Sequence, residues 1–172
     1  MNLLDLNETR PYMIKELDGD ISSDRLYLSP RLNELGRNAY PGLLRSACTD
    51  GTAESFALAI QSGGFLLLRE MSHRKGVPYE KAVPVNAHQT LAEGEFNRFY
   101  LRGLCLRAMG GEGSLVVYRA RESSNPRPES VALLGTTVDA SALLADLREN
   151  IGLDTVLGIP AGPNSGLSVR LN

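Results

Sequence analysis

Most of the side chains that could do chemistry lie in one stretch, residues 86–111. His88 and Cys105 are the residue types of a thiol nucleophile and its general base. Arg98 and Arg102 could bind phosphate or carboxylate groups. Glu93 could serve as a general acid if burial raised its pKa. Each of these roles depends on how the backbone positions the side chains.

A helical conformation would keep the candidate nucleophile away from its base. Seventeen residues separate His88 from Cys105, which corresponds to about 25 Å along a helix. A zinc site is not favoured either. Cys48, His73, His88 and Cys105 show none of the paired spacings of structural zinc sites.

Glu93 has a simpler role than catalysis. Thr90 and Glu93 have the T-x-x-E spacing of a capping box, in which the Glu side chain binds a free backbone N–H at a helix start. The alternative is a hydrolase that uses Glu93 with Asp139 or Asp146 as a pair of catalytic carboxylates. No spacing in the sequence supports such a pair. We therefore predict a protein that is not an enzyme, without catalytic residues, metal or cofactor.

The apolar pattern predicts one long buried helix over residues 90–109. Ala92, Phe96, Phe99, Gly103 and Leu106 repeat at helical spacing on one face. Other apolar residues extend this face past half the circumference, so we expect the helix to be buried on two sides. The glycine in its middle indicates the close approach of another backbone.

The polar strip of this helix is narrow and contains Glu95, Arg98 and Arg102. We expect it to face solvent, with an i,i+3 pair between Glu95 and Arg98 that contributes about 0.2–0.5 kcal/mol. An alternative function uses the same arginines. Arg98 and Arg102, together with Arg119 and Arg121 on a predicted strand, could form a local patch that binds nucleic acid or another anion.

Length and composition indicate one globular domain. The 172 residues are 42% hydrophobic and 22% charged, which excludes disordered and coiled-coil classes. A net charge of −2 means that any nucleic-acid contact must be local. Two cysteines suit a reducing compartment, and neither a signal peptide nor a membrane span is apparent. We expect a cytoplasmic protein, made in the host cytoplasm, with a virion as a further destination.

The remaining segments predict an α+β fold. Short helices are expected in residues 25–64, with Thr52 and Ser55 capping one of them. Residues 65–72, 79–86 and 114–121 have the patterns of strands, and Asp139 or Ser141 is the candidate cap for a helix that ends at Gly152. The core domain therefore spans residues 25–157, with the central helix packed on a small sheet.

Both ends of the chain are expected to be extended arms. Residues 1–24 are mixed and polar, with one candidate short helix around Pro11–Leu17, and residues 158–172 form a Gly/Pro loop and a tail. Such ends are poorly ordered unless something holds them, so we expect neighbouring subunits to bind them. The residues predicted to contact partners are Leu3, Leu6, Tyr12, Pro160, Pro163, Leu167 and Val169.

Three segments, "LAEGEFNRFYLRGLCLRA", "NPRPES" and "GPNSGLSVRL", resemble small phage and prophage proteins without an assigned activity. The resemblance implies a virion or mobile-element protein. The favoured function is thus a non-enzymatic structural or assembly component of a multi-subunit particle, such as a capsid-associated or connector protein of a phage. Its partners would be other copies of itself or other subunits, and nucleic-acid binding or processing is the alternative.

Overall fold

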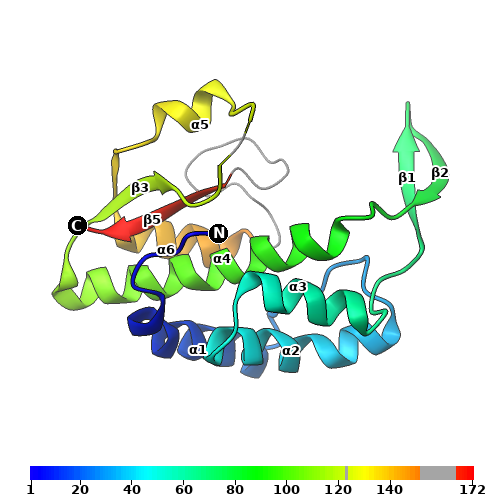
Figure 1. Cartoon of the computed structure of the whole chain (residues 1–172), viewed down its shortest axis with the longest axis horizontal. Helices are drawn as coiled ribbons and strands as arrows, with labels where there is room; N and C mark the ends of the chain where they lie inside the picture. Colours follow the sequence, from blue (N-terminus) through cyan, green and yellow to red (C-terminus); the bar gives the residue numbers. More distant parts are fainter. Residues whose placement is uncertain (123, 152–165) are drawn as a thin grey trace.

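The computed structural model describes residues 1–122, 124–151 and 166–172. Three helices form one layer, the long helix α4 lies in the middle, and α6 with a small sheet covers the other side (Figure 1). The elements are α1 (Leu6–Ser22), α2 (Glu34–Thr49), α3 (Ala53–Ser62), β1 (Arg69–Arg74), β2 (Val77–Ala82), α4 (Ala87–Arg107), the π-helical turn η1 (Ala108–Glu112), β3 (Leu115–Arg119), α5 (Pro128–Ala132), β4 (Thr137–Val138), α6 (Ala140–Glu149) and β5 (Leu167–Leu171). The predicted α+β class with one long central helix is confirmed.

Helix α4 is buried along most of its length, as its apolar pattern predicts. Phe96, Phe99, Tyr100 and Leu104 are almost fully inaccessible to solvent. At Gly103 a Cβ atom would lie 2.7 Å from Thr9 Cγ2, so α1 crosses α4 at the glycine. The close approach expected at this position is therefore present.

Residues 1–24 do not form an extended arm, because residues 6–22 fold as α1 and pack along α4. Met13 and Leu17 are fully buried at that contact. The buried face of α1 also carries Glu16 and Asp20, and these carboxylates hide its amphipathic pattern in the sequence. The polar appearance of this segment reflects charges that the fold buries.

The C-terminal tail is likewise part of the fold. Strand β5 pairs antiparallel with β3, with Val169 opposite Val117, and the sheet order is β4-β3-β5. Leu167 and Val169, predicted to contact a partner, are buried in the core. The prediction for these two residues was wrong because their apolar side chains point into the core from a strand of the sheet.

The other predicted arm residues differ in their placement. Leu3 and Leu6 pack partly buried against the core, and Tyr12 is half-buried on α1. Pro160 and Pro163 lie outside the described residues. None of the arm residues that the structure describes therefore extends away from the body.

Helix caps were predicted with mixed success. The Thr52 and Ser55 side chains form a reciprocal capping box at α3, and Asp139 caps α6 by accepting from Ala142 N–H. The Thr90–Glu93 capping box is wrong, because α4 begins three residues earlier and Thr90 Oγ1 donates to the Asn86 carbonyl. Among the described residues, no helix is both long and apolar enough to cross a membrane.

Candidate functional site

The arginine predicted to lie on the solvated strip of α4 is in fact an interior residue. Arg102 is 2% exposed. Its Nε donates to Glu16 Oε2 at 2.8 Å, and its Nη1 donates to Asp20 Oδ2 at 2.5 Å. Both carboxylates come from α1. The guanidinium is therefore neutralised by the helix that covers it, and it is unavailable to phosphate.

A second arginine extends this network to α6. Arg148 Nη2 donates to Glu16 Oε1 at 2.5 Å, so Glu16 accepts from two guanidinium groups. Burial acts to raise the pKa of Glu16, but the hydrogen bonds from Arg148 and Arg102 outweigh it and hold the pKa below its ordinary value. The network ties α1, α4 and α6 together.

Arg98 is the second buried arginine of α4. It donates to Glu95 Oε1 at 3.3 Å and to the carbonyls of Leu147 and Asn150 at 3.2 and 2.9 Å. These two carbonyls belong to the C-terminal end of α6, where a cation is favourable. Burial raises the pKa of Glu95 despite the neighbouring Arg98. The i,i+3 pair was predicted correctly, but it lies inside the protein.

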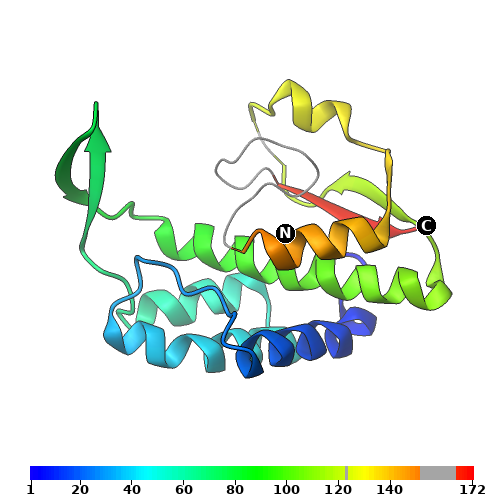
Figure 2. The ribbon, with the colours of Figure 1, turned by 180° about the vertical axis from the view of Figure 1, so that it is seen from behind.

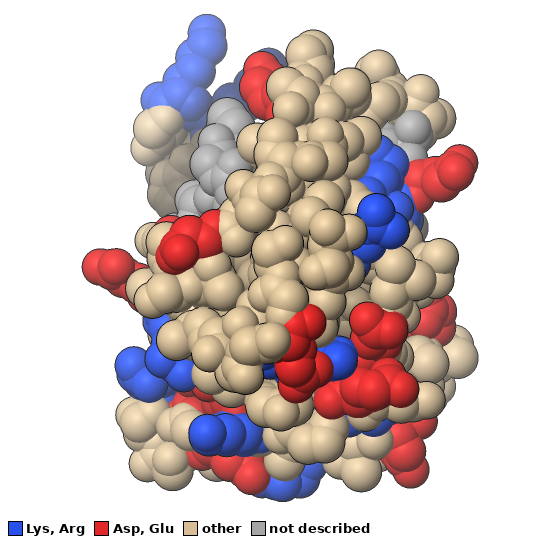
Figure 3. All heavy atoms as spheres, turned by 90° about the vertical axis from the view of Figure 1, so that its left-hand side faces the viewer, with Lys and Arg blue, Asp and Glu red and all other residues tan. Residues whose placement is uncertain are grey.

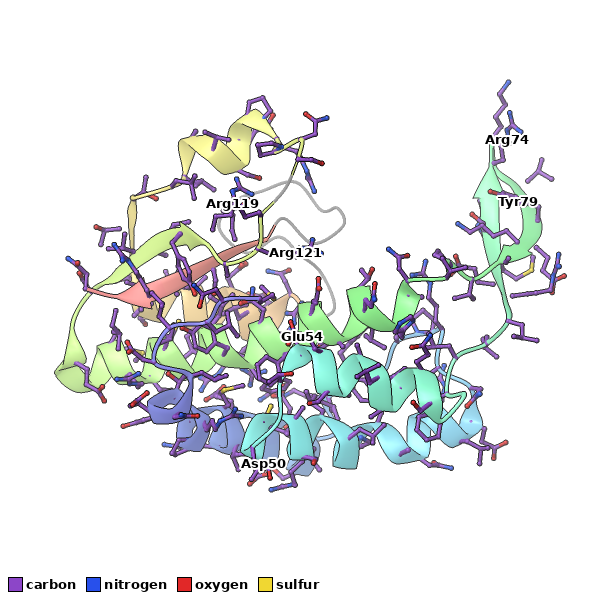
Figure 4. The ribbon with its side chains drawn as sticks, in the orientation of Figure 1. Asp50, Glu54, Arg74, Tyr79, Arg119 and Arg121 are labelled. Carbon is purple, nitrogen blue, oxygen red and sulfur yellow. The ribbon has the colours of Figure 1, made fainter. Side chains whose placement is uncertain are left out.

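The four arginines of the proposed nucleic-acid patch therefore do not come together. Arg98 and Arg102 are buried between the helices, whereas Arg119 and Arg121 lie on or just after β3 of the small sheet (Figure 4). Arg121 Nη1 donates to Glu93 Oε2 at 2.6 Å. Of the two α4 arginines, Arg102 is held by carboxylates of α1, and Arg98 is held by Glu95 and by carbonyls at the end of α6.

The candidate nucleophiles are also separated. Cys48 lies on α2, Cys105 lies on α4, and burial raises the pKa of each thiol to about 12. His88 lies in the first turn of α4, at the other end from Cys105, and His73 lies on β1. Within the described ranges, no three His, Cys, Asp or Glu side chains form a group that could hold a metal.

The most exposed element is the hairpin formed by β1 and β2. It projects away from the helical body and stands clear of it in both views (Figures 1 and 2). The strands pair antiparallel from Arg69 opposite Ala82 to Arg74 opposite Val77. Lys75 and Gly76 make the turn with φ of 50° and 80°, as a two-residue type I′ turn requires.

The hairpin and the segments at its root expose large apolar side chains. Leu68 is 87% exposed and Val85 is 97% exposed. The full exposed set comprises Leu67, Leu68, Met71, Val77, Tyr79 and Val85. The strand register places Val77 and Tyr79 on one face of the ribbon and Met71 on the other. Single exposed apolar residues are common, so the indication of an interaction surface is their number on and beside one projecting element.

Ion pairs hold the root of the hairpin to the body. Glu70 Oε2 accepts from Arg31 Nε at 2.6 Å, and Lys81 Nζ lies 3.3 Å from Glu70 Oε1. The Arg31 hydrogen bond lowers the pKa of Glu70, and burial only partly opposes it. At the other end, the cations of the tip are Arg74 and Lys75, for which no carboxylate partner is found among the described residues.

An open hollow of about 210 Å³ lies beside this root. Residues 64–68 and 83–85 line it, together with Ile60, Gln61 and His88. The sequence signal for it was the run "FLLL" at residues 65–68, which we interpreted as the start of a strand. Strand β1 begins only at Arg69, so the run forms the wall of the hollow.

Charge is mixed on the end of the molecule opposite the hairpin. There Lys and Arg side chains lie scattered among Asp and Glu (Figure 3). No family model, curated protein or solved structure matches this chain. The hairpin and its root are therefore the candidate functional site on geometry alone.

Proposed function

We propose that this protein is a non-enzymatic assembly subunit that contacts its partner through the hairpin β1–β2. The observation that carries the proposal is the group of exposed apolar side chains on a ribbon that the body does not cover. A two-stranded hairpin is only marginally stable in water. A partner that packs on it would remove the apolar surface from water and stabilise the ribbon.

The rigid body supports this proposal. The buried network of Glu16, Arg102 and Arg148 holds three helices together, and the Arg31–Glu70 pair fixes the root of the hairpin to that body. The ribbon is therefore presented in one direction, which limits the entropy lost on binding. The described parts of both chain ends, α1 and β5, are by contrast used in internal packing.

A phage particle is the assembly that the sequence resemblance suggests. The subunit would be made in the cytoplasm of the host and then join a capsid-associated or connector structure. The segments that carry the resemblance are residues 91–108, 125–130 and 162–171, and they include most of the central helix and no part of the hairpin.

The test uses light scattering coupled to size exclusion, at micromolar concentration and above. Residues 69–82 are replaced by a short Gly/Ser linker, which the chain tolerates because Val83 N–H already bonds to the Leu68 carbonyl at 3.0 Å. We expect the full chain to form a defined oligomer and the shortened chain to be monomeric with an unchanged melting temperature.

The matched control is Met109→Ser, which removes an exposed apolar side chain just beyond the C-terminal end of α4. This variant should associate like the original chain. A full chain that stays monomeric at all concentrations would contradict the proposal. So would an oligomer that persists without the hairpin.

Nucleic-acid binding is the second candidate, and the cationic tip favours it. Figure 4 shows Arg74 at the free end of the ribbon and Tyr79 on its second strand. Affinity for duplex DNA should then fall steeply with salt and drop in Arg74→Ala with Lys75→Ala. Arg69→Ala, which removes a cation already paired with Glu80, is the control. Absence of binding at low ionic strength would exclude this candidate.

A further inference from the structure

Strand β1 has an outer edge whose backbone groups point away from the hairpin. In an antiparallel pair, residues alternate between those that bond to the partner strand and those that direct N–H and C=O outward. The two-residue turn makes Arg74 and Val77 a hydrogen-bonded pair. The Val83 N–H also bonds to the Leu68 carbonyl, and these residues are an even number of positions from Val77 and Arg74, so they fit the same alternation. Arg69, Met71 and His73 therefore direct their backbone groups outward.

The outer edge of β2 is less able to accept another strand. By the same alternation its outward residues are Pro78, Glu80 and Ala82. Proline has no N–H, so the ladder of donors along this edge is interrupted near the tip. The hairpin therefore has one edge that is competent for strand addition, the edge of β1.

We propose that this edge pairs with the same edge of a second copy of the chain, forming a four-stranded antiparallel sheet across a two-fold axis. This inference rests on the proposed function, because it names the partner of the hairpin. Identical strands that pair antiparallel are self-complementary about such an axis. The hairpin stands clear of the helical body, with β1 on the side nearer the body and β2 on the far side (Figure 2).

The charge pattern of β1 selects the register. With the axis at Ser72, Met71 of one copy forms hydrogen-bonded pairs with His73 of the other. Glu70, whose carboxylate already accepts from Arg31, then lies opposite Arg74 of the other copy, in a pair that brings side chains closest. An axis at Met71 would place Arg69 opposite His73, and an axis at Glu70 would place two carboxylates together.

The same arrangement explains why pairing stops at two copies. A growing fibre would need β1 of one copy to add to β2 of the next, and Pro78 interrupts that edge. Pairing through β1 alone is isologous and therefore closed. The expected species is a dimer, which larger assemblies can then use as a unit.

The first experiment is a disulfide cross-link in the full chain. Ser72→Cys places two thiols at the axis, where Cα atoms of such a pair are about 4.5 Å apart and a disulfide can form. Cys48 and Cys105 are buried and do not compete. We expect mild oxidation to give a covalent dimer. Tyr79→Cys is the control. Tyr79 lies opposite Ser72 on β2, which is the edge strand of the proposed sheet and lies away from the two-fold axis, so this variant should not cross-link.

The second experiment removes one outward donor from each edge in turn. Met71→Pro deletes an N–H that the hairpin itself does not use, and it should raise the dimer dissociation constant about tenfold or more. Glu80→Pro deletes the corresponding N–H of β2, and it should leave the dimer unchanged.

The outcomes separate this inference from the proposed function. A hairpin-dependent oligomer that neither cross-links at Ser72 nor weakens in Met71→Pro overturns the register and leaves the proposed function standing. A monomeric full chain overturns both. Salt-sensitive binding of DNA to a monomer through Arg74 and Lys75 replaces both with the nucleic-acid function.

Discussion

Two regions of this protein pair arginines with carboxylates, and they do so in opposite environments. In the interior, Arg102 lies between Glu16 and Asp20 with almost no exposure. On the hairpin, Arg69 and Glu80 form a pair at 2.6 Å with side chains that are 57% and 56% exposed. The interior pair was desolvated on folding, whereas the hairpin pair remains in water.

The difference teaches that residue type does not decide the role of a charged side chain here. Water screens the hairpin pair, so losing either partner costs little. The interior charges have no water to replace a lost partner, so each depends on the others. The interior network therefore stabilises the body, whereas the surface charges can contribute to the recognition of a binding partner.

The largest effect is expected from breaking the interior network at its centre. Arg102→Met leaves Glu16 and Asp20 of α1 without their shared partner, and it should lower the free energy of unfolding by about 3–5 kcal/mol. Urea denaturation followed by circular dichroism measures this. A loss below about 1 kcal/mol would mean that water reaches these carboxylates. The interior network would then not differ from the exposed pair on the hairpin.

A smaller and pH-dependent effect is expected at Glu16. Because its folded pKa is lower than its unfolded value, near 4.5, the carboxylate stabilises the fold above that pH. This contribution is lost as the pH falls through the folded pKa. Glu16→Gln should cost about 1.5–3 kcal/mol at neutral pH, and the difference from the original chain should shrink as the pH falls below 4.5. A pH-independent difference would contradict this assignment.

The crossing of α1 and α4 can be tested beside the network. At Gly103→Ala the new methyl group would press on Thr9 and Met13, and it should destabilise the protein by about 1–3 kcal/mol. Gly94→Ala in the same helix meets no atom within 4 Å, so it should stabilise by about 0.5–1 kcal/mol through helix propensity. If Gly103→Ala and Gly94→Ala changed the melting temperature equally, the close approach of α1 to α4 at Gly103 would be contradicted.

The smallest effect belongs to the hairpin pair. Arg69→Ala should change the free energy of unfolding by less than about 1 kcal/mol, because the pair is exposed and screened. Thermal denaturation at low and high salt measures it. A loss as large as that of Arg102→Met would show that exposure does not separate the two regions.

The sequence predicted the parts of the fold that local patterns encode. The central helix was expected over residues 90–109 and is found over Ala87–Arg107, because its apolar spacing is regular. Thr52 and Asp139 cap their helices as expected, since capping depends on neighbouring residues alone. The general fold class followed from these elements.

The candidate site could not be predicted in the same way. Only a short helix around Pro11–Leu17 was expected where α1 spans Leu6–Ser22, because the buried face of α1 contains Glu16 and Asp20. The neutralisation of these carboxylates by Arg102 depends on residues more than eighty positions apart. The segments around the hairpin were expected to contain strands, but no local pattern tells whether two strands join a sheet or stand apart. That outcome depends on what the rest of the chain covers.

The ion pair between Glu16 and Arg148 links residues 132 positions apart. During synthesis, α1 leaves the ribosome before α4 and α6 are made. Until then, Glu16 and Asp20 lack the arginines that neutralise them and are expected to stay in water. The body can close only when nearly the whole chain has emerged, because α1 packs on α4 and Glu16 bonds to Arg148 of α6. A truncated product lacking α6 would leave Glu16 short of one partner, and such a chain would be a ready target for proteolysis.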